Sequence, residues 1–185
     1  MSSTANHPHE RAPGPGALAV LYFGYFTQAL NITGTLLILL MAMSVNLDVG
    51  GRNLFNQPIP GVNEFIGLSI VAVVFLQMAN TLQEGRHVSN DILIRLISDT
   101  HPRLSDALYA LFNLIGALLM AFIVVYVWPL FMENYENGYF SGTAGIVEIP
   151  VWPFMAVVVI GSVATAIQFL IAAGQLARRA LAGTA

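Results

Sequence analysis

The chain has 185 residues, of which 56% are hydrophobic and only 9% are charged, and its formal net charge is −3. Soluble globular proteins carry about 25% charged residues, so the composition excludes an ordinary soluble domain, and no basic excess indicates a nucleic-acid partner. The absence of cysteine excludes disulfides, cysteine-held iron–sulfur clusters and thiol catalysis.

Four long runs of the chain contain no Asp, Glu, Lys or Arg. They cover residues 12–47, 65–83, 107–132 and 149–177. A bilayer core of ~30 Å needs about 20 apolar residues in a helix, so each run is long enough to cross it. A soluble bundle would need charged outer faces with a helical period, and these runs have none. The sequence therefore predicts an all-α membrane protein with four transmembrane helices, at about 17–45, 63–83, 104–132 and 150–177.

The segment before the first helix, "MSSTANHPHERAPGPG", is polar and holds prolines and glycines. We expect residues 1–16 to form a disordered cytoplasmic tail. They are not expected to be a secretory signal, because the apolar run that follows is too long and no convincing small-residue cleavage site closes it. The predicted organisation is this tail, a four-helix membrane domain over 17–178 and a second cytoplasmic tail over 179–185.

The first predicted helix carries a stripe of small and polar residues. Gly24, Gln28, Asn31 and Thr35 follow one another at steps of four, three and four, so they share one helical face. Helices in lipid associate through close packing at small residues and through hydrogen bonds between polar side chains. These four residues are candidates for a subunit interface, and contact with the other helices of this chain is the alternative.

The first loop, "GGRNLFNQPIPGVNE" (50–64), holds more than turn residues. Two prolines and a glycine would hold it tight. If the first helix continues to near Phe55 and the second begins near Val62, Arg52 and Glu64 come together at the membrane boundary. We predict an ion pair there that fixes how the two helices meet. The alternative is two separately solvated charges.

The second connection contains an amphipathic segment, "SNDILIRLISD" (89–99), with four aliphatic residues on one helical face. Such a segment can lie in the plane of the membrane interface. A plain helical linker in the cytoplasm is the alternative.

The arginines predict the orientation of the chain in the membrane. Arg52 is the one arginine of the first loop, and the third connection has none. The tails and the second connection hold Arg11, Arg86, Arg95, Arg103, Arg178 and Arg179. Because positive residues are enriched on the cytoplasmic side, both termini are predicted to be cytoplasmic, with the first loop outside.

No Asp, Glu, Lys, Arg or His lies in the central part of a predicted span. A proton-coupled carrier needs one there, so a self-sufficient transporter is disfavoured. A membrane haem needs paired histidines inside the helices, whereas all four histidines lie in the N-terminal tail and the second connection. No nucleophile stands beside a histidine and an acid. We therefore expect no enzyme, no cofactor and no metal site.

Five stretches in a fixed order carry a family resemblance: "GRNLF", "PIPGVNE", "FLQMA", "GRHVSND" and "IPVWP". The chain resembles, over about residues 15–178, the small integral-membrane subunit of TRAP (tripartite ATP-independent periplasmic) transporters. It departs from that pattern at Asn53, where an aromatic is usual, and at Asn90, where an aliphatic is usual. The matching positions are Gly51, Arg52, Phe55, Pro58, Gly61, Glu64, Phe75, Leu76, His87, Val88 and Asp91.

The resemblance implies a small subunit that enlarges the stationary scaffold of a transporter in the bacterial inner membrane. Its partners would be a large multi-spanning permease subunit, a periplasmic solute-binding protein and membrane lipids, with sodium-driven uptake of an organic acid. The first loop then becomes an assembly device and a candidate docking surface for the binding protein. The alternative is a membrane anchor or assembly subunit of another inner-membrane complex, such as a redox enzyme. The candidate assembly residues are Arg52, Phe55, Pro58, Gly61, Glu64, His87 and Asp91.

Overall fold

The computed structural model of the chain describes residues 15–84 and 102–182. Over these residues the predicted all-α fold is confirmed: four helices are long and apolar enough to cross a membrane. A short antiparallel hairpin joins the last two, with Phe140 opposite Pro150. The elements are α1 (Pro15–Phe55), α2 (Val62–Gln83), α4 (Pro102–Asn137), β1 (Phe140–Ser141), β2 (Ile149–Pro150) and α5 (Trp152–Ala182).

α1 is longer than the span predicted at 17–45, and it ends at Phe55, as the argument from the first loop predicted. Nothing between residues 46 and 55 stops a helix, whereas proline at 58 and 60 cannot continue one. Asn56 leaves the helix in the left-handed region, with φ 54°, where asparagine is tolerated. A helix of 41 residues is about 60 Å long, so α1 must tilt or extend past a ~30 Å bilayer core.

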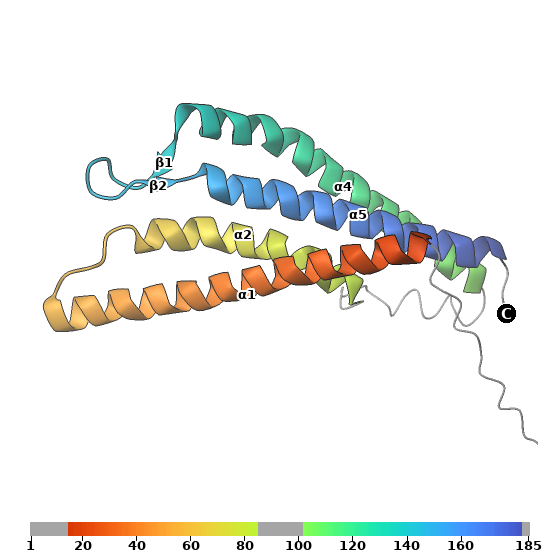
Figure 1. Cartoon of the computed structure of the whole chain (residues 1–185), viewed down its shortest axis with the longest axis horizontal. Coiled ribbons are helices and arrows are strands. Elements are labelled where there is room, and N and C mark those ends of the chain that lie inside the picture. The colour runs from red at the N-terminus through yellow and green to blue at the C-terminus, as the bar shows by residue number, and fades with distance from the viewer. Residues whose placement is uncertain (1–14, 85–101, 183–185) are drawn as a thin grey trace, which may run out of the picture.

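The helices lie side by side in the order α1, α2, α5, α4 (Figure 1). α2 and α5 occupy the centre, α1 packs on α2 at one edge, and α4 packs on α5 at the other edge. α4 carries Pro129 within its length, which removes a helical hydrogen bond and favours the curvature seen in Figure 1.

The buried positions of this layer are mostly small or polar. Ala79 and Thr27 are fully buried, whereas Leu118 and Leu54 are 70% and 79% exposed. In lipid, small residues let helix backbones approach closely and hydroxyls bond between helices. The large apolar side chains therefore point outward, toward lipid or other subunits, as a membrane environment requires.

Two ends of the layer can be distinguished in Figure 1. The hairpin end carries the α1–α2 turn (56–61) and the α4–α5 connection with its hairpin (138–151). The terminal end is where α1 begins and where α2 and α5 finish. The arginine pattern predicts that the hairpin end lies outside the cell.

Candidate functional site

At the hairpin end, Asp48 fixes the α1–α2 turn. Its side chain is only 10% exposed. Oδ1 accepts a hydrogen bond of 2.7 Å from the backbone N–H of Ile59, eleven residues further on. Oδ2 accepts one of 2.9 Å from Nε of Arg52, one helical turn away. One carboxylate thus ties the last turns of α1 to the loop, and it satisfies a loop N–H that would otherwise lack a partner.

This arrangement corrects the predicted pairing of Arg52 with Glu64. Among the described residues, the ion pair of Arg52 is with Asp48. The Arg52 side chain is 53% exposed, so the pair is solvent-screened and adds little stability. Sequence reasoning missed the role of Asp48, although its spacing of four residues from Arg52 on one helix was a readable signal.

Gly61 joins the two connections at this end. Its φ is 88°, a conformation that L residues rarely adopt. A Cβ placed there would lie 2.5 Å from Cγ1 of Val147, in the α4–α5 connection. The missing side chain therefore lets Val147 seat against the turn, while the Gly61 carbonyl accepts the N–H of Phe65 at 2.9 Å in the first turn of α2.

The loop that presents Val147 is itself ordered by short-range bonds. The N–H of Val147 donates to the carbonyl of Thr143 at 3.1 Å. The N–H of Gly145 donates to Oε1 of Glu148 at 3.1 Å. At Gly142, with φ 125°, a Cβ would meet the carbonyl oxygen of Val147 at 2.3 Å, so this position too requires glycine.

A hollow of about 360 Å³ lies between the two connections. Arg52 and Glu64 both line it without forming an ion pair. Nearby Phe55, at the end of α1, is 75% exposed. The structure thus brings four of the five predicted residues of the first loop, all except Phe55, to one hollow. Its lining residues are Arg52, Pro58, Ile59, Pro60, Gly61, Asn63, Glu64, Thr143, Ile146 and Val147.

Nearer the terminal end, two glutamines of α2 fill gaps on α1. A Cβ on Gly24 would lie 2.8 Å from Nε2 of Gln83, and a Cβ on Gly34 would lie 2.8 Å from Cγ of Gln77. The hydroxyl of Thr27, which is fully buried, bonds to Oε1 of Gln83. The α1–α2 seam is therefore closed by small residues on one helix and long amides on the other.

The predicted interface stripe is split by this seam. Gly24 packs within the chain, and Thr35 Oγ1 accepts a 3.4 Å bond from Nε2 of Gln77. Asn31 is half-buried, whereas Gln28 is exposed and forms no hydrogen bond with the described residues. The alternative of contact within the chain therefore holds for Gly24 and in part for Thr35, and Gln28 remains the candidate for contact with another molecule.

The centre of the layer depends on one close approach between α2 and α5. A Cβ on Gly161 would lie 2.4 Å from the carbonyl oxygen of Phe75. Thr165, one turn later, is fully buried, and its hydroxyl donates a hydrogen bond of 2.8 Å to the Gly161 carbonyl. The face of α5 that carries Gly161 and Thr165 is thus used inside the chain.

Three further predictions concern residues outside the described part of the chain. The assembly candidates His87 and Asp91, the amphipathic segment 89–99 and residues 1–14 of the predicted tail 1–16 fall there, while residues 15 and 16 of that tail begin α1. Within the described residues, no group of three or more His, Asp or Glu side chains is placed to hold a metal ion.

A comparison with known protein families identifies the family of this chain. The family described as "Tripartite ATP-independent periplasmic transporters, DctQ component" matches residues 41–179, more than half of the chain. The chain belongs to the DctQ family. No curated protein and no solved structure matches it.

Membership of the DctQ family confirms the resemblance to the small permease component of TRAP transporters. It makes the chain a component of a transporter rather than a member of an enzyme family. The matched range contains Asp48 with its partners Arg52 and Ile59, the α1–α2 turn and the hairpin, while Gly24, Gln28 and Asn31 lie before it. The family match thus covers the hairpin end and the α2 side of the α1–α2 seam, but not the α1 side of that seam.

Proposed function

We propose that the chain is the small scaffold subunit of a TRAP-type secondary transporter. It supports a large permease subunit in the sodium-driven, binding-protein-dependent uptake of an organic acid. It resides in the bacterial inner membrane with both termini in the cytoplasm. The observation that carries the proposal is the DctQ family match over residues 41–179.

The distribution of charge supports a scaffold rather than a carrier. Carriers that couple to an ion gradient place polar or ionisable groups near the bilayer midplane, often on broken helices. Here each of the four helices contains most or all of one long charge-free run. Asp48, Arg52, Glu64 and Glu84 lie near helix ends. The substrate and ion sites are then expected on the large subunit.

The open layer of helices supports the need for a partner. α1 packs mainly on α2 and α4 mainly on α5, and both outer helices present large exposed apolar side chains such as Leu36 and Phe122. Lipid covers part of this surface and the large permease subunit covers the rest. Exposed Gln28 is a contact candidate there, because an amide in lipid gains most from a protein partner.

The surface around the hollow at the hairpin end is a second contact candidate. Arg52, Phe55, Pro58 and Glu64 are at least partly exposed there. On the predicted outer face they would meet the solute-binding protein or an outer loop of the large subunit. His87 and Asp91 remain proposed assembly residues on the cytoplasmic side.

Deleting only the gene for this chain in its host tests the proposal. The solute is first identified by screening organic acids for thermal stabilisation of the cognate binding protein. The deletion should abolish sodium-dependent uptake of that solute, while the large subunit still appears in the membrane fraction, and a plasmid copy should restore uptake. Undiminished uptake in the deletion strain would contradict the scaffold role.

A further inference from the structure

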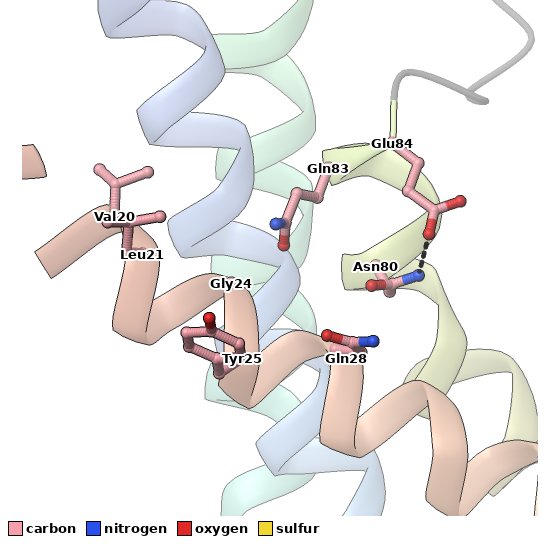
Figure 2. Close-up of a pocket in the computed structure, with 8 residues that line it drawn as sticks. All are labelled: Val20, Leu21, Gly24, Tyr25, Gln28, Asn80, Gln83 and Glu84. Atoms are coloured by element: carbon pink, nitrogen blue, oxygen red, sulfur yellow. Dashed lines mark hydrogen bonds between the residues drawn. The ribbon is translucent and has the colours of Figure 1, made fainter. Parts of the chain in front are cut away.

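A second hollow, of about 340 Å³, lies between α1 and α2 at the terminal end (Figure 2). Val20, Leu21 and Tyr25 of α1 line it, and all three are exposed. Polar side chains close the remaining sides. They are Gln28 of α1 and Asn80, Gln83 and Glu84 at the end of α2.

Asn80 is the organising residue of this hollow. It is 7% exposed, so more than nine-tenths of it is buried. Its Nδ2 donates to Oε1 of Glu84 at 3.1 Å, which ties the carboxylate to Asn80 at the edge of the hollow (Figure 2). No described residue donates to Oδ1 of Asn80, and that oxygen is not completely sealed from the surface. Oδ1 of Asn80 is therefore an unused acceptor that faces the hollow. Leaving such a largely buried acceptor without a donor costs free energy.

The hollow attracts positive charge. Glu84 is the only charged residue among the eight that line it, and an ionised carboxylate accepts several hydrogen bonds. Glu84 also follows directly on the last residue of α2, where the helix dipole places partial negative charge. With Oδ1 of Asn80 and the amide oxygen of Gln28, the hollow offers acceptors from three side chains, which suits a group with several N–H donors.

The depth of the hollow indicates where such a group comes from. α2 has 22 residues and is about 33 Å long, close to the ~30 Å bilayer core. Glu84 therefore lies at one membrane boundary, at the level of lipid headgroups.

We propose that this hollow binds the primary ammonium headgroup of an aminophospholipid. The three N–H groups of the headgroup donate to Glu84, Asn80 Oδ1 and Gln28. A quaternary choline headgroup carries the same charge but has no N–H to donate, so the site distinguishes the two lipids. The proposal goes beyond the transport role and requires only that the chain lies in a membrane.

Native mass spectrometry of the purified full-length chain tests this proposal. The chain is exchanged against phosphatidylethanolamine, phosphatidylcholine and phosphatidylglycerol with identical acyl chains. The wild-type chain should retain phosphatidylethanolamine about tenfold better than phosphatidylcholine, as expected for hydrogen bonds to a charged group. Glu84→Gln, which keeps the shape of the side chain, should remove most of this preference, and Gln28→Leu should reduce it by a smaller factor.

Glu133→Gln is the matched control, because Glu133 is also an exposed carboxylate near the end of a helix, at the hairpin end of α4. It should leave the lipid preference unchanged. Equal retention of the two zwitterionic lipids by the wild-type chain would overturn the proposal, and so would an unchanged preference in Glu84→Gln. If Glu84→Gln instead left lipid retention intact but weakened co-purification with the large subunit, the hollow would hold a cationic side chain of that protein, and the proposal would fail.

Discussion

The two ends of the α1–α2 pair are built in different ways. At the hairpin end, both oxygens of Asp48 are bonded within the chain, and Gly61 receives Val147 from the other connection. At the terminal end, Gln28 and Oδ1 of Asn80 face a hollow without a donor or acceptor from the described residues. The hairpin end therefore stabilises the chain's own fold, whereas the terminal end leaves polar groups available to another molecule.

The largest expected difference between the ends is their side of the membrane. The chain has no cysteine, so single cysteines can be introduced at Asn56, Ser98, Ser141 and Thr184. A membrane-impermeant thiol reagent added to intact spheroplasts should label Asn56→Cys and Ser141→Cys only, with all four labelled after lysis. Labelling of Ser98→Cys in intact spheroplasts would contradict the predicted orientation.

A methyl group added at the hairpin end should be costly. Gly61→Ala combines a left-handed backbone with a contact of 2.5 Å to Val147, so we expect a loss of about 2–5 kcal/mol of unfolding free energy. Gly138→Ala has a similar backbone, φ 62°, but open space around it, and it should cost only about 1–2 kcal/mol. Unfolding in mixed detergent micelles measures both.

The double variant Gly61→Ala with Val147→Ala separates the two causes at this position. Shortening Val147 removes the close contact and leaves the backbone strain, so part of the loss should be recovered. Equal losses in Gly61→Ala and Gly138→Ala, with no recovery in the double variant, would show that the two connections do not depend on this contact.

The hairpin end also shows how far sequence reasoning reaches. The four helices and the limits Phe55 and Val62 followed from charge-free runs and prolines, because these are local properties of the chain. The partner of Arg52 did not follow, because the choice between Asp48 and Glu64 depends on how the loop folds back. Asp48 accepts from Ile59, a contact over eleven residues that no periodicity predicts.

The seam shows the same limit. The stripe at Gly24, Gln28, Asn31 and Thr35 was recognised as a helix-contact surface. In the structure, the face of α1 that contacts α2 includes Thr27 and Gly34. These two residues follow Gly24 at equally regular helical steps. A small rotation of one helix decides which residues are inside, and the sequence of α1 alone does not determine it.

Charge changes at the hairpin end should separate Asp48 from its neighbours. Asp48→Ala leaves the Ile59 N–H without its acceptor and should cost about 2–3 kcal/mol. Arg52→Ala should cost about 0–1 kcal/mol, because the Arg52 side chain is largely exposed. In a double-mutant cycle, Arg52 and Glu64 should be additive to within about 0.5 kcal/mol. A larger coupling between Arg52 and Glu64 would restore the pairing expected from sequence.

The smallest expected effect lies in the seam. Thr27→Val removes the hydroxyl that bonds to Gln83 and should cost about 0.6 kcal/mol, as interhelical hydrogen bonds in membranes do. Thr33→Val is the control, since the Thr33 hydroxyl bonds to the carbonyl of Ala29 on its own helix. Thermal unfolding of both variants in one detergent measures the difference, and equal costs would argue against a specific Thr27–Gln83 bond.

Reconstituted uptake tests the scaffold role most directly. Liposomes containing this chain alone, the large permease subunit alone, or both are given the binding protein, its solute and an inward sodium gradient. The account predicts sodium-dependent uptake only when both subunits are present. The central parts of the four described helices contain no Asp, Glu, Lys or Arg that could take part in ion coupling. Uptake by this chain without the large subunit would contradict the account.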